Sequence, residues 1–565
     1  MLKTTDLIVF LIYFVIVSAY GIYIYRRKKR QEETAADFFL AEGSLTWWAI
    51  GASLIASNIS AEQFIGMSGS GFKLGLAISA YEWLAAASLI VVAIFFMPIY
   101  LKNKIFTMPQ FLKTRYNETV ALIMAVFWLF LYVAVNLTSI LFLGTLAINS
   151  LTGGEHFHII MIGLAAFALI ITLGGMKVIG YTDVMQVLVL IIGGLVTTYI
   201  ALTMVSDYFG LGKSVLAGFN KLMTEAPEHF KMIFDKPGPG ASASEMSNYL
   251  DLPGVTMLIA GMWIANLNYW GCNQYITQRA LGADLKTART GILFAGFLKL
   301  IMPIIVVLPG IAAYVLFKNG QLQEQMAAGG TVNADNAYSA ILAFLPTGLK
   351  GLSMAALTAA IVASLAGKAN SISTIYTLDI YKKYVKKDAS EKKLLWMGRV
   401  VIVVALLIAI LANWNDLLGI GGAGGFIFIQ KYTGYVSPAI FSVFLLGFFW
   451  KGNTSRAAIA GVIVGVVVMI LFDKYLPGIA GHETWLYTAF PNTNGVYEIP
   501  FMVSMGWAFF FSIVLMVIIS FFDKKERLQT KGLEVDTKMF RVSNSTLVMS
   551  LVIIGVLLAL YIIFW

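Results

Sequence analysis

Apolar runs of about 20 residues, separated by short polar segments, recur along almost the whole chain. Runs of this length can cross a bilayer as α-helices. The sequence therefore predicts an all-α membrane protein with about 14 transmembrane helices. The predicted helices lie near residues 7–25, 47–72, 76–100, 119–150, 157–175, 184–205, 253–276, 290–317, 339–380, 396–413, 418–450, 456–474, 500–522 and 545–564.

Two of these predicted helices are interrupted by polar and small residues. The 47–72 helix contains Ser57–Gln63, and the 253–276 helix carries Asn266–Gly271. Their positions in the helix order differ by five, so they run in opposite directions, as in transporters built from inverted repeats. The resulting organisation is one domain, 1–565, with repeats at 47–205 and 253–450 and peripheral helices at 7–25 and 456–564.

Composition supports the membrane interpretation. The chain is 59% hydrophobic and 12% charged, against about 25% charged in soluble proteins. Its net charge of +10 reflects topology, so no nucleic-acid partner is expected. If Arg26–Arg30 is cytoplasmic, about 28 of the 40 Lys and Arg residues fall in cytoplasmic segments and about 9 outside. This distribution predicts that both termini and the long segments 206–252 and 475–499 lie outside.

Several polar residues lie inside apolar helices, where an ionisable group is a candidate functional site. Glu82 and Lys299 have opposite charge, so they form either a structural ion pair or part of a site for a polyol. Gln430-Lys431-Tyr432 is expected to interrupt the 418–450 helix. Gln63 and Asn266 lie on the interrupted helices, where a binding site should form. The aromatic residues Tyr81, Tyr269, Trp270 and Phe426 either stack on a sugar ring or pack in the core.

A sodium ion needs hard oxygen ligands, which an unwound helix can supply as free carbonyls together with a hydroxyl. The break at Ala56–Ile59 provides such carbonyls. Ser364 provides a hydroxyl, or is a serine bonded back to its own helix. Asp183 is either a helix N-cap or a carboxylate that attracts the cation.

Other motifs indicate neither an enzyme nor a bound cofactor. Gly419–Gly424 fits the G-x-G-x-x-G pattern but follows no predicted strand, so a nucleotide site is not expected. The chain shows no arrangement of nucleophile and base. Its one cysteine, Cys272, excludes an internal disulfide.

Longer motifs resemble the sodium/solute symporter family, in particular its sugar-transporting bacterial members. The similar segments are Gly51–Gly71, Trp263–Gly271, Val306–Tyr314, Gln430–Gly434 and Gly447–Lys451. The resemblance covers essentially the whole chain. It implies a LeuT-like fold with five-plus-five inverted repeats, one extra helix before them and three after.

The resemblance also implies residue roles. Gln63, Glu82, Asn266, Lys299 and Gln430 would hydrogen-bond a sugar, with Tyr269 stacking on it as an inner gate and Asn58, Met67, Tyr81 and Phe426 nearby. Sodium would bind the carbonyls of Ala56 and Ile59, with Ala360 and Ser364, and Asp183 would act indirectly.

Two positions depart from the family pattern. Ala363 replaces the first serine of the family's sodium-binding pair, and Ala85 replaces a serine near the sugar in galactose-transporting members. The retained polar residues favour a hexose.

The expected function is sodium-coupled import of a galactose- or glucose-like hexose across the bacterial inner membrane by alternating access. The alternatives are symport of myo-inositol, an amino acid or a sialic acid, and a passive sugar channel. The sequence leaves the oligomeric state open.

Overall fold

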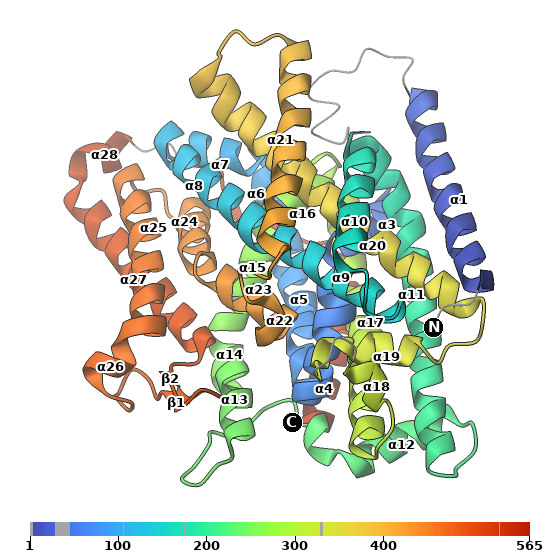
Figure 1. The fold of residues 1–565 in the computed structure, drawn as a ribbon. Helices are drawn as coiled ribbons and strands as arrows, with labels where there is room; N and C mark the ends of the chain where they lie inside the picture. The colour runs from blue at the N-terminus through green and yellow to red at the C-terminus, as the bar shows by residue number, and fades with distance from the viewer. Residues whose placement is uncertain (1–3, 29–45, 106, 174–175, 328–331, 530–531) are drawn as a thin grey trace. The chain divides into compact units, whose positions relative to one another are not determined.

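The computed structural model describes residues 4–28, 46–105, 107–173, 176–327, 332–529 and 532–565. These residues are mostly helical, as predicted (Figure 1). They form two compact units, each assembled from three separate stretches of chain. The first unit comprises Met1–Ser79, Leu129–Lys231 and Leu298–Ile429. The second comprises Ala80–Trp128, Met232–Phe297 and Gln430–Trp565.

The first unit is organised around helix α20 (Leu349–Thr374), whose side chains are buried along most of its length. Helices α1, α3, α9, α10, α11 and α21 pack around α20 (Figure 1). Its elements are α1 (Thr4–Lys28), α3 (Trp47–Asn58), η1 (Glu62–Met67), α4 (Ser68–Leu74), η2 (Gly75–Ser79), η4 (Leu131–Leu137), α9 (Thr138–Leu151), α10 (Phe157–Thr172), α11 (Met176–Tyr208), α12 (Val215–Glu225), η5 (Pro227–Phe230), α18 (Gln323–Met326), η6 (Ala334–Asn336), α19 (Ala337–Leu342), α20, η7 (Ile375–Val385), α21 (Glu391–Asn413) and α22 (Ile420–Ala423).

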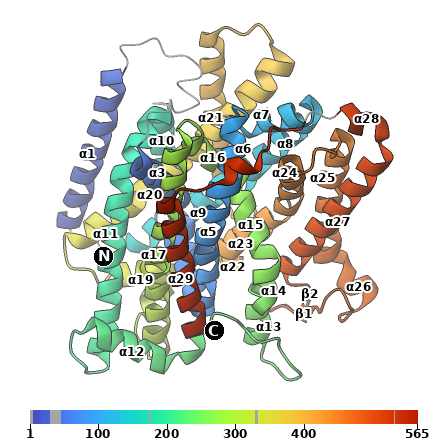
Figure 2. The same cartoon turned by 180° about the vertical axis from the view of Figure 1, so that it is seen from behind.

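In the second unit, helix α15 connects the helices on either side of it, because it packs on α5, α24 and α27. Helices α24, α25 and α27 also pack on one another, and α29 runs beside α5 (Figure 2). Its elements are α5 (Ala80–Val91), η3 (Val92–Phe96), α6 (Met97–Lys102), α7 (Met108–Arg115), α13 (Ala243–Asp251), α14 (Gly254–Ile259), α15 (Gly261–Gly271), α16 (Gln274–Leu281), α24 (Ser437–Phe449), α25 (Ser455–Ile470), η8 (Leu471–Tyr475), α26 (Leu476–Ala480), β1 (Phe490–Pro491), β2 (Tyr497–Glu498), α27 (Phe501–Phe522), α28 (Lys524–Gln529), η9 (Thr537–Phe540) and α29 (Asn544–Phe564).

Three helices contribute residues to both units. They are α8 (Glu118–Phe130), α17 (Leu285–Lys318) and α23 (Gly425–Gly434). The two units do not coincide with the repeats expected at 47–205 and 253–450, and the repeat boundaries remain a prediction.

The predicted break in the first long apolar segment is confirmed. Helix α3 ends at Asn58, Ile59 is extended, and the chain re-enters a helix as the π-helical turn η1. Turns of this kind are frequent at functional sites. The second predicted break is also present, but it lies at Ala260, where α14 and α15 meet at 77°. It therefore precedes the polar stretch that begins at Asn266.

The expected interruption at Gln430-Lys431-Tyr432 is wrong, because these residues lie within helix α23. The breaks lie on either side. Gly424 has φ = 74°, a left-handed conformation that glycine adopts readily. After α23 the chain bends by 50° into α24, where Pro438 occupies the first turn. Proline has no N–H to donate to the carbonyl one turn earlier, so a continuous helix would lose that bond.

By length and hydropathy, the described residues contain nine candidate membrane spans, or eleven if each bent pair is one span. The count of fourteen remains a prediction. The long segments expected outside the membrane are partly structured. Residues 206–252 include α12 and α13, and residues 475–499 include α26 and the antiparallel pair β1–β2.

Candidate functional site

The break after α3 releases two backbone carbonyls. In a continuous helix, the Ser60 N–H would bond to the Ala56 carbonyl, but it donates instead to Gln63 Oε1 at 3.1 Å. The Gln63 N–H, which would bond to Ile59, donates to the Ser60 carbonyl at 3.2 Å. The Ala56 and Ile59 carbonyls therefore lose their usual helical donors.

Ser364 brings a hydroxyl to this break from helix α20. It is fully buried, and its Oγ lies 3.4 Å from the Ile59 carbonyl oxygen. Ala360 lies four residues earlier on the same helix, and therefore on the same face. The structure thus brings together Ile59 and Ser364, two of the predicted sodium ligands. A hydroxyl beside carbonyls freed from a helix is a donor set that suits a sodium ion.

The N-cap interpretation of Asp183 is wrong. Helix α11 begins at Met176, so the backbone of Asp183 lies within the helix. Its side chain lies outside the part of the chain that the structure describes.

Five predicted sugar residues lie in the first unit. They are Asn58, Gln63, Met67, Lys299 and Phe426, all buried. The Lys299 ammonium, 1% exposed on α17, donates to Asn58 Oδ1. The structure therefore brings these two residues together.

The start of α23 approaches the π-helical turn η1 closely. A Cβ atom added at Gly66 would lie 2.8 Å from the backbone nitrogen of Phe426. Because Gly66 has no side chain, the segment carrying Phe426 packs directly against the segment carrying Gln63 and Met67. Close packing against Phe426 therefore explains why Gly66 is a glycine.

The other five predicted sugar residues lie in the second unit. They are Tyr81, Glu82, Asn266, Tyr269 and Gln430. Helix α5 carries Tyr81 and Glu82 and packs on α15, which carries Asn266 and Tyr269. The Asn266 amide donates to the Met262 carbonyl at 3.1 Å. Glu82 and Lys299 belong to different units, so the structure describes the surroundings of each one separately.

Sequence reasoning did not single out Lys368. This lysine is 3% exposed on α20, one turn after Ser364, and donates to Asn136 Oδ1 at 3.0 Å. Its ammonium also lies 5.6 Å from the Tyr132 ring centroid. Lys368 could have been identified from the sequence, because it is a charged residue within the predicted apolar helix 339–380, and a charge inside the membrane marks a candidate site.

These features define a class of protein. The chain has many apolar spans, and its broken helices release buried backbone carbonyls beside a hydroxyl. This combination is typical of a membrane secondary transporter.

Comparison with known proteins gives the family. The family model described as "Sodium:solute symporter family" matches residues 38–465, and the chain belongs to this family. The chain is 44% identical over its full length to the sodium/glucose cotransporter of Vibrio parahaemolyticus, covering 99% of that protein. It is 31% identical to human sodium/myo-inositol cotransporter 2, over 92% of this chain and 75% of that protein.

A solved structure supports the LeuT-like fold. The structure of a Na⁺-coupled sialic acid symporter in a substrate-bound, outward-open state superposes with a TM-score of 0.72 and 21% identity, covering 92% of this chain and 98% of that one. The protein is therefore a sodium/solute symporter in a multi-pass membrane fold, and not an enzyme. Sodium is its coupling ion.

Proposed function

We propose that this symporter imports a hexose together with sodium. The full-length similarity to a protein named sodium/glucose cotransporter supports a hexose as the solute. The chemistry of the candidate residues agrees with this solute, since sugar hydroxyls both donate and accept hydrogen bonds. The Lys299 ammonium can donate, Glu82 can accept, and the amides of Gln63, Asn266 and Gln430 can do both.

One observation supports coupling between sodium binding and sugar binding. Ala56 and Ile59, the proposed sodium ligands, alternate with Asn58 and Gln63, proposed sugar residues, within eight residues of one interrupted segment. A sodium ion bound to the carbonyls would order this segment and hence fix Asn58 and Gln63. Sodium would then raise sugar affinity, and sugar would raise sodium affinity by the same factor.

We further propose that Tyr269 covers the bound sugar. Its ring is only half-buried and lies 5.2 Å from the Trp270 ring in an edge-to-face arrangement. Asn266 lies three residues earlier on α15, so both side chains occupy one face of the helix. Asn266 can then bond a hydroxyl while the Tyr269 ring excludes water.

The second candidate solute is myo-inositol, since several relatives at 31–32% identity are named sodium/myo-inositol cotransporter 2. A cyclic polyol presents nearly the same hydroxyls as a hexose. Ala85 replaces a hydroxyl near the proposed sugar site, so the preferred epimer has to be measured.

The test is uptake into proteoliposomes. Labelled D-glucose, D-galactose and myo-inositol are offered with an inward sodium gradient, and again with potassium replacing sodium. The proposal expects accumulation of a hexose only with sodium. Accumulation of myo-inositol without either hexose would transfer the assignment to the cyclitol, whereas equal entry with potassium would indicate a passive channel.

We also propose that the protein lies in the bacterial inner membrane with both termini outside, on the basis of the Lys and Arg distribution. Cys272 is buried, so a cysteine added at either terminus provides a distinct site for a membrane-impermeant thiol reagent. The proposal expects labelling of both added cysteines in intact cells from which the outer membrane has been removed. Protection of either one until the inner membrane is opened would contradict it.

A further inference from the structure

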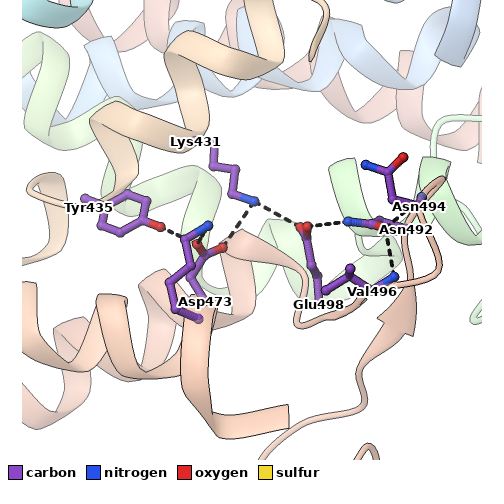
Figure 3. A network of polar contacts seen from close by, with 8 residues as sticks. Lys431, Tyr435, Asp473, Asn492, Asn494, Val496 and Glu498 are labelled. Carbon is purple, nitrogen blue, oxygen red and sulfur yellow. Dashed lines mark hydrogen bonds and ion pairs between the residues drawn. The ribbon is translucent and has the colours of Figure 1, made fainter. Parts of the chain in front are cut away.

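A network of charged groups in the second unit includes Lys431, which follows Gln430 in the chain (Figure 3). The Lys431 ammonium, on helix α23, lies 3.1 Å from Asp473 Oδ1 and donates to Glu498 Oε2 at 3.0 Å. Lys474 lies 2.9 Å from Asp473 Oδ2. Two cations thus balance two carboxylates. We call Lys431, Tyr435, Asp473, Lys474 and Glu498 the Lys431 network.

Asp473 is the buried centre of this network. Its side chain is 1% exposed, whereas that of Lys431 is 25% exposed. The Tyr435 hydroxyl donates to Asp473 Oδ2. Lys431 lies in the last turn of α23, and Tyr435 lies four residues later, in the bend between Gly434 and Ser437. The last turn of α23 and the bend that follows it are therefore both bonded to one buried carboxylate.

Glu498 connects the network to a β-hairpin. It lies in β2, and its Oε1 accepts a hydrogen bond from the Asn492 amide at 2.7 Å. Asn492 Oδ1 in turn accepts from the backbone N–H groups of Asn494 and Val496, which shapes the turn (Figure 3). Lys431 thus joins α23 to both η8 and the hairpin.

We propose that Lys431 is a positioning residue for sugar binding, which acts through its helix neighbour Gln430. This inference rests on the proposed function, in which Gln430 bonds the sugar. Binding groups have to be held within about 0.5 Å and 10–20° of their working geometry. Lys431 and Tyr435, held by Asp473, fix the rotation of the end of α23 about its axis, and this rotation sets the direction of the Gln430 amide.

The coupling also runs in the opposite direction. Since Lys431 bonds Glu498, a sugar that restrains Gln430 also restrains the hairpin, because linkage between two sites is reciprocal. Bound sugar should slow hydrogen exchange of the hairpin amides in the wild type. The same sugar should leave exchange in Lys431→Met unchanged.

The main test is equilibrium binding of labelled D-glucose and D-galactose to the purified full-length protein at saturating sodium. Lys431→Met keeps the length of the side chain and removes its charge. We expect it to raise the sugar Kd about fivefold or more, while sodium binding without sugar stays at the wild-type value. Lys431→Arg should recover much of the affinity, since a guanidinium can bond both carboxylates.

Lys474→Met is the matched control. Lys474 contacts the same carboxylate, but it lies on η8, and its side chain is 57% exposed. Its loss removes a charge without releasing α23, so the sugar Kd should change by less than about threefold. Equal effects of Lys431→Met and Lys474→Met would show that only net charge matters and would overturn the proposal.

Lys431→Met could fail to fold because it leaves the buried Asp473 without its partner Lys431. The double variant Lys431→Met/Asp473→Asn avoids this problem, because it leaves no unpaired buried charge. Weakened sugar binding is expected in this double variant too, and wild-type binding would overturn the proposal. Gln430→Ala distinguishes the hypothesis that Gln430 bonds the sugar from the hypothesis that Lys431 positions Gln430. Wild-type binding by Gln430→Ala would remove Gln430 from the proposed sugar site. Lost binding in Gln430→Ala combined with wild-type binding in Lys431→Met would defeat the positioning role alone.

Discussion

At the residue scale, the proposed sodium site depends most on Ser364. Its hydroxyl lies 3.4 Å from the freed Ile59 carbonyl, and Ala363 has no hydroxyl to share the task. A polar contact with a charged group contributes about 1.5–3 kcal/mol. Ser364→Ala should therefore raise the half-saturating sodium concentration for uptake about tenfold or more. Ala363→Ser, which adds a second hydroxyl, should lower it.

Thr358→Val is the control for this series. Thr358 is buried on the same helix, but its hydroxyl donates to the Met354 carbonyl one turn earlier at 2.8 Å. Its loss should leave the sodium dependence unchanged. If Ser364→Ala and Thr358→Val showed the same sodium dependence, Ser364 would not be a sodium ligand but an ordinary serine bonded to its own helix.

Tyr269 provides a test of the proposed sugar lid. Tyr269→Phe retains the ring and should keep most sugar binding. Tyr269→Ala should lose retention of sugar, because an aromatic face contributes about 0.5–1.5 kcal/mol beyond its burial. The measurement is hexose binding and sodium-driven uptake by both variants. Wild-type accumulation by Tyr269→Ala would show that the ring only packs.

Asp335 makes stability depend on pH. It lies outside the candidate spans, is 1% exposed and accepts from the Gly425 N–H at 2.8 Å. Burial raises its pKa from the ordinary 3.8 to about 7, against the opposing effect of that hydrogen bond. The folded state thus binds this proton more tightly than the unfolded state. The contribution of Asp335 to the free energy of unfolding falls as pH rises from about 4 to 7, by up to about 1.4 kcal/mol per unit.

Asp335→Asn removes this titration while keeping an oxygen for Gly425. The Tm of the variant in detergent should exceed that of the wild type by a margin that grows between pH 5 and pH 8. A constant difference in Tm across this range would mean that Asp335 does not change protonation there.

The sequence singles out polar residues in apolar helices, but it does not give their hydrogen-bond partners. Glu82 and Lys299 stand out because ionisable groups are costly in apolar helices. The bond from Lys299 to Asn58 joins residues 241 positions apart, and no local pattern encodes such a contact. The role of Gln63 in accepting the Ser60 N–H depends on backbone geometry, which residue types alone do not specify.

At the element scale, the contact between α4 and η6 depends on Gly69. An added Cβ would lie 2.4 Å from Asp335 Oδ1 and 2.9 Å from its Cα. The backbone of η6 would have to move, so Gly69→Ala should destabilise the protein by about 1–3 kcal/mol. Gly163→Ala on α10 is the control, because its Cβ meets open space. The latter change should be neutral or stabilising by about 0.4–1 kcal/mol.

The measurement is the Tm of both glycine variants in detergent. An unchanged Tm in Gly69→Ala would show that η6 does not hold its position against α4.

The location of helix breaks was only partly predictable. The break at Ser57–Gln63 carries a local signal, since polar and small residues interrupt an apolar run. The bend at Ala260 carries a weaker one, because Gly261 permits close packing against Met502. Polar side chains at Gln430-Lys431-Tyr432 suggest a break, but these residues are helical. In the structure, Lys431 instead satisfies its charge against Asp473 and Glu498.

At the scale of the whole molecule, the helical membrane fold followed from apolar runs and from motifs spread over the chain. The division into two interleaved units did not, because it depends on contacts between stretches that are distant in sequence. The sequence predicts fourteen helices. In the described residues, length and hydropathy identify nine candidate spans, or eleven if each bent pair is one span, and two shorter apolar helices. The count of fourteen therefore stays a prediction.

The most direct test of sodium-coupled sugar import is a dual-label flux experiment. Purified protein in proteoliposomes is given radioactive sodium and tritiated D-glucose or D-galactose, and the entry of both is followed in the same vesicles. The account predicts that hexose enters against its gradient, that hexose stimulates sodium entry, and that the two rise in a fixed ratio. Hexose entry that stops at equilibrium and adds no sodium flux would contradict it.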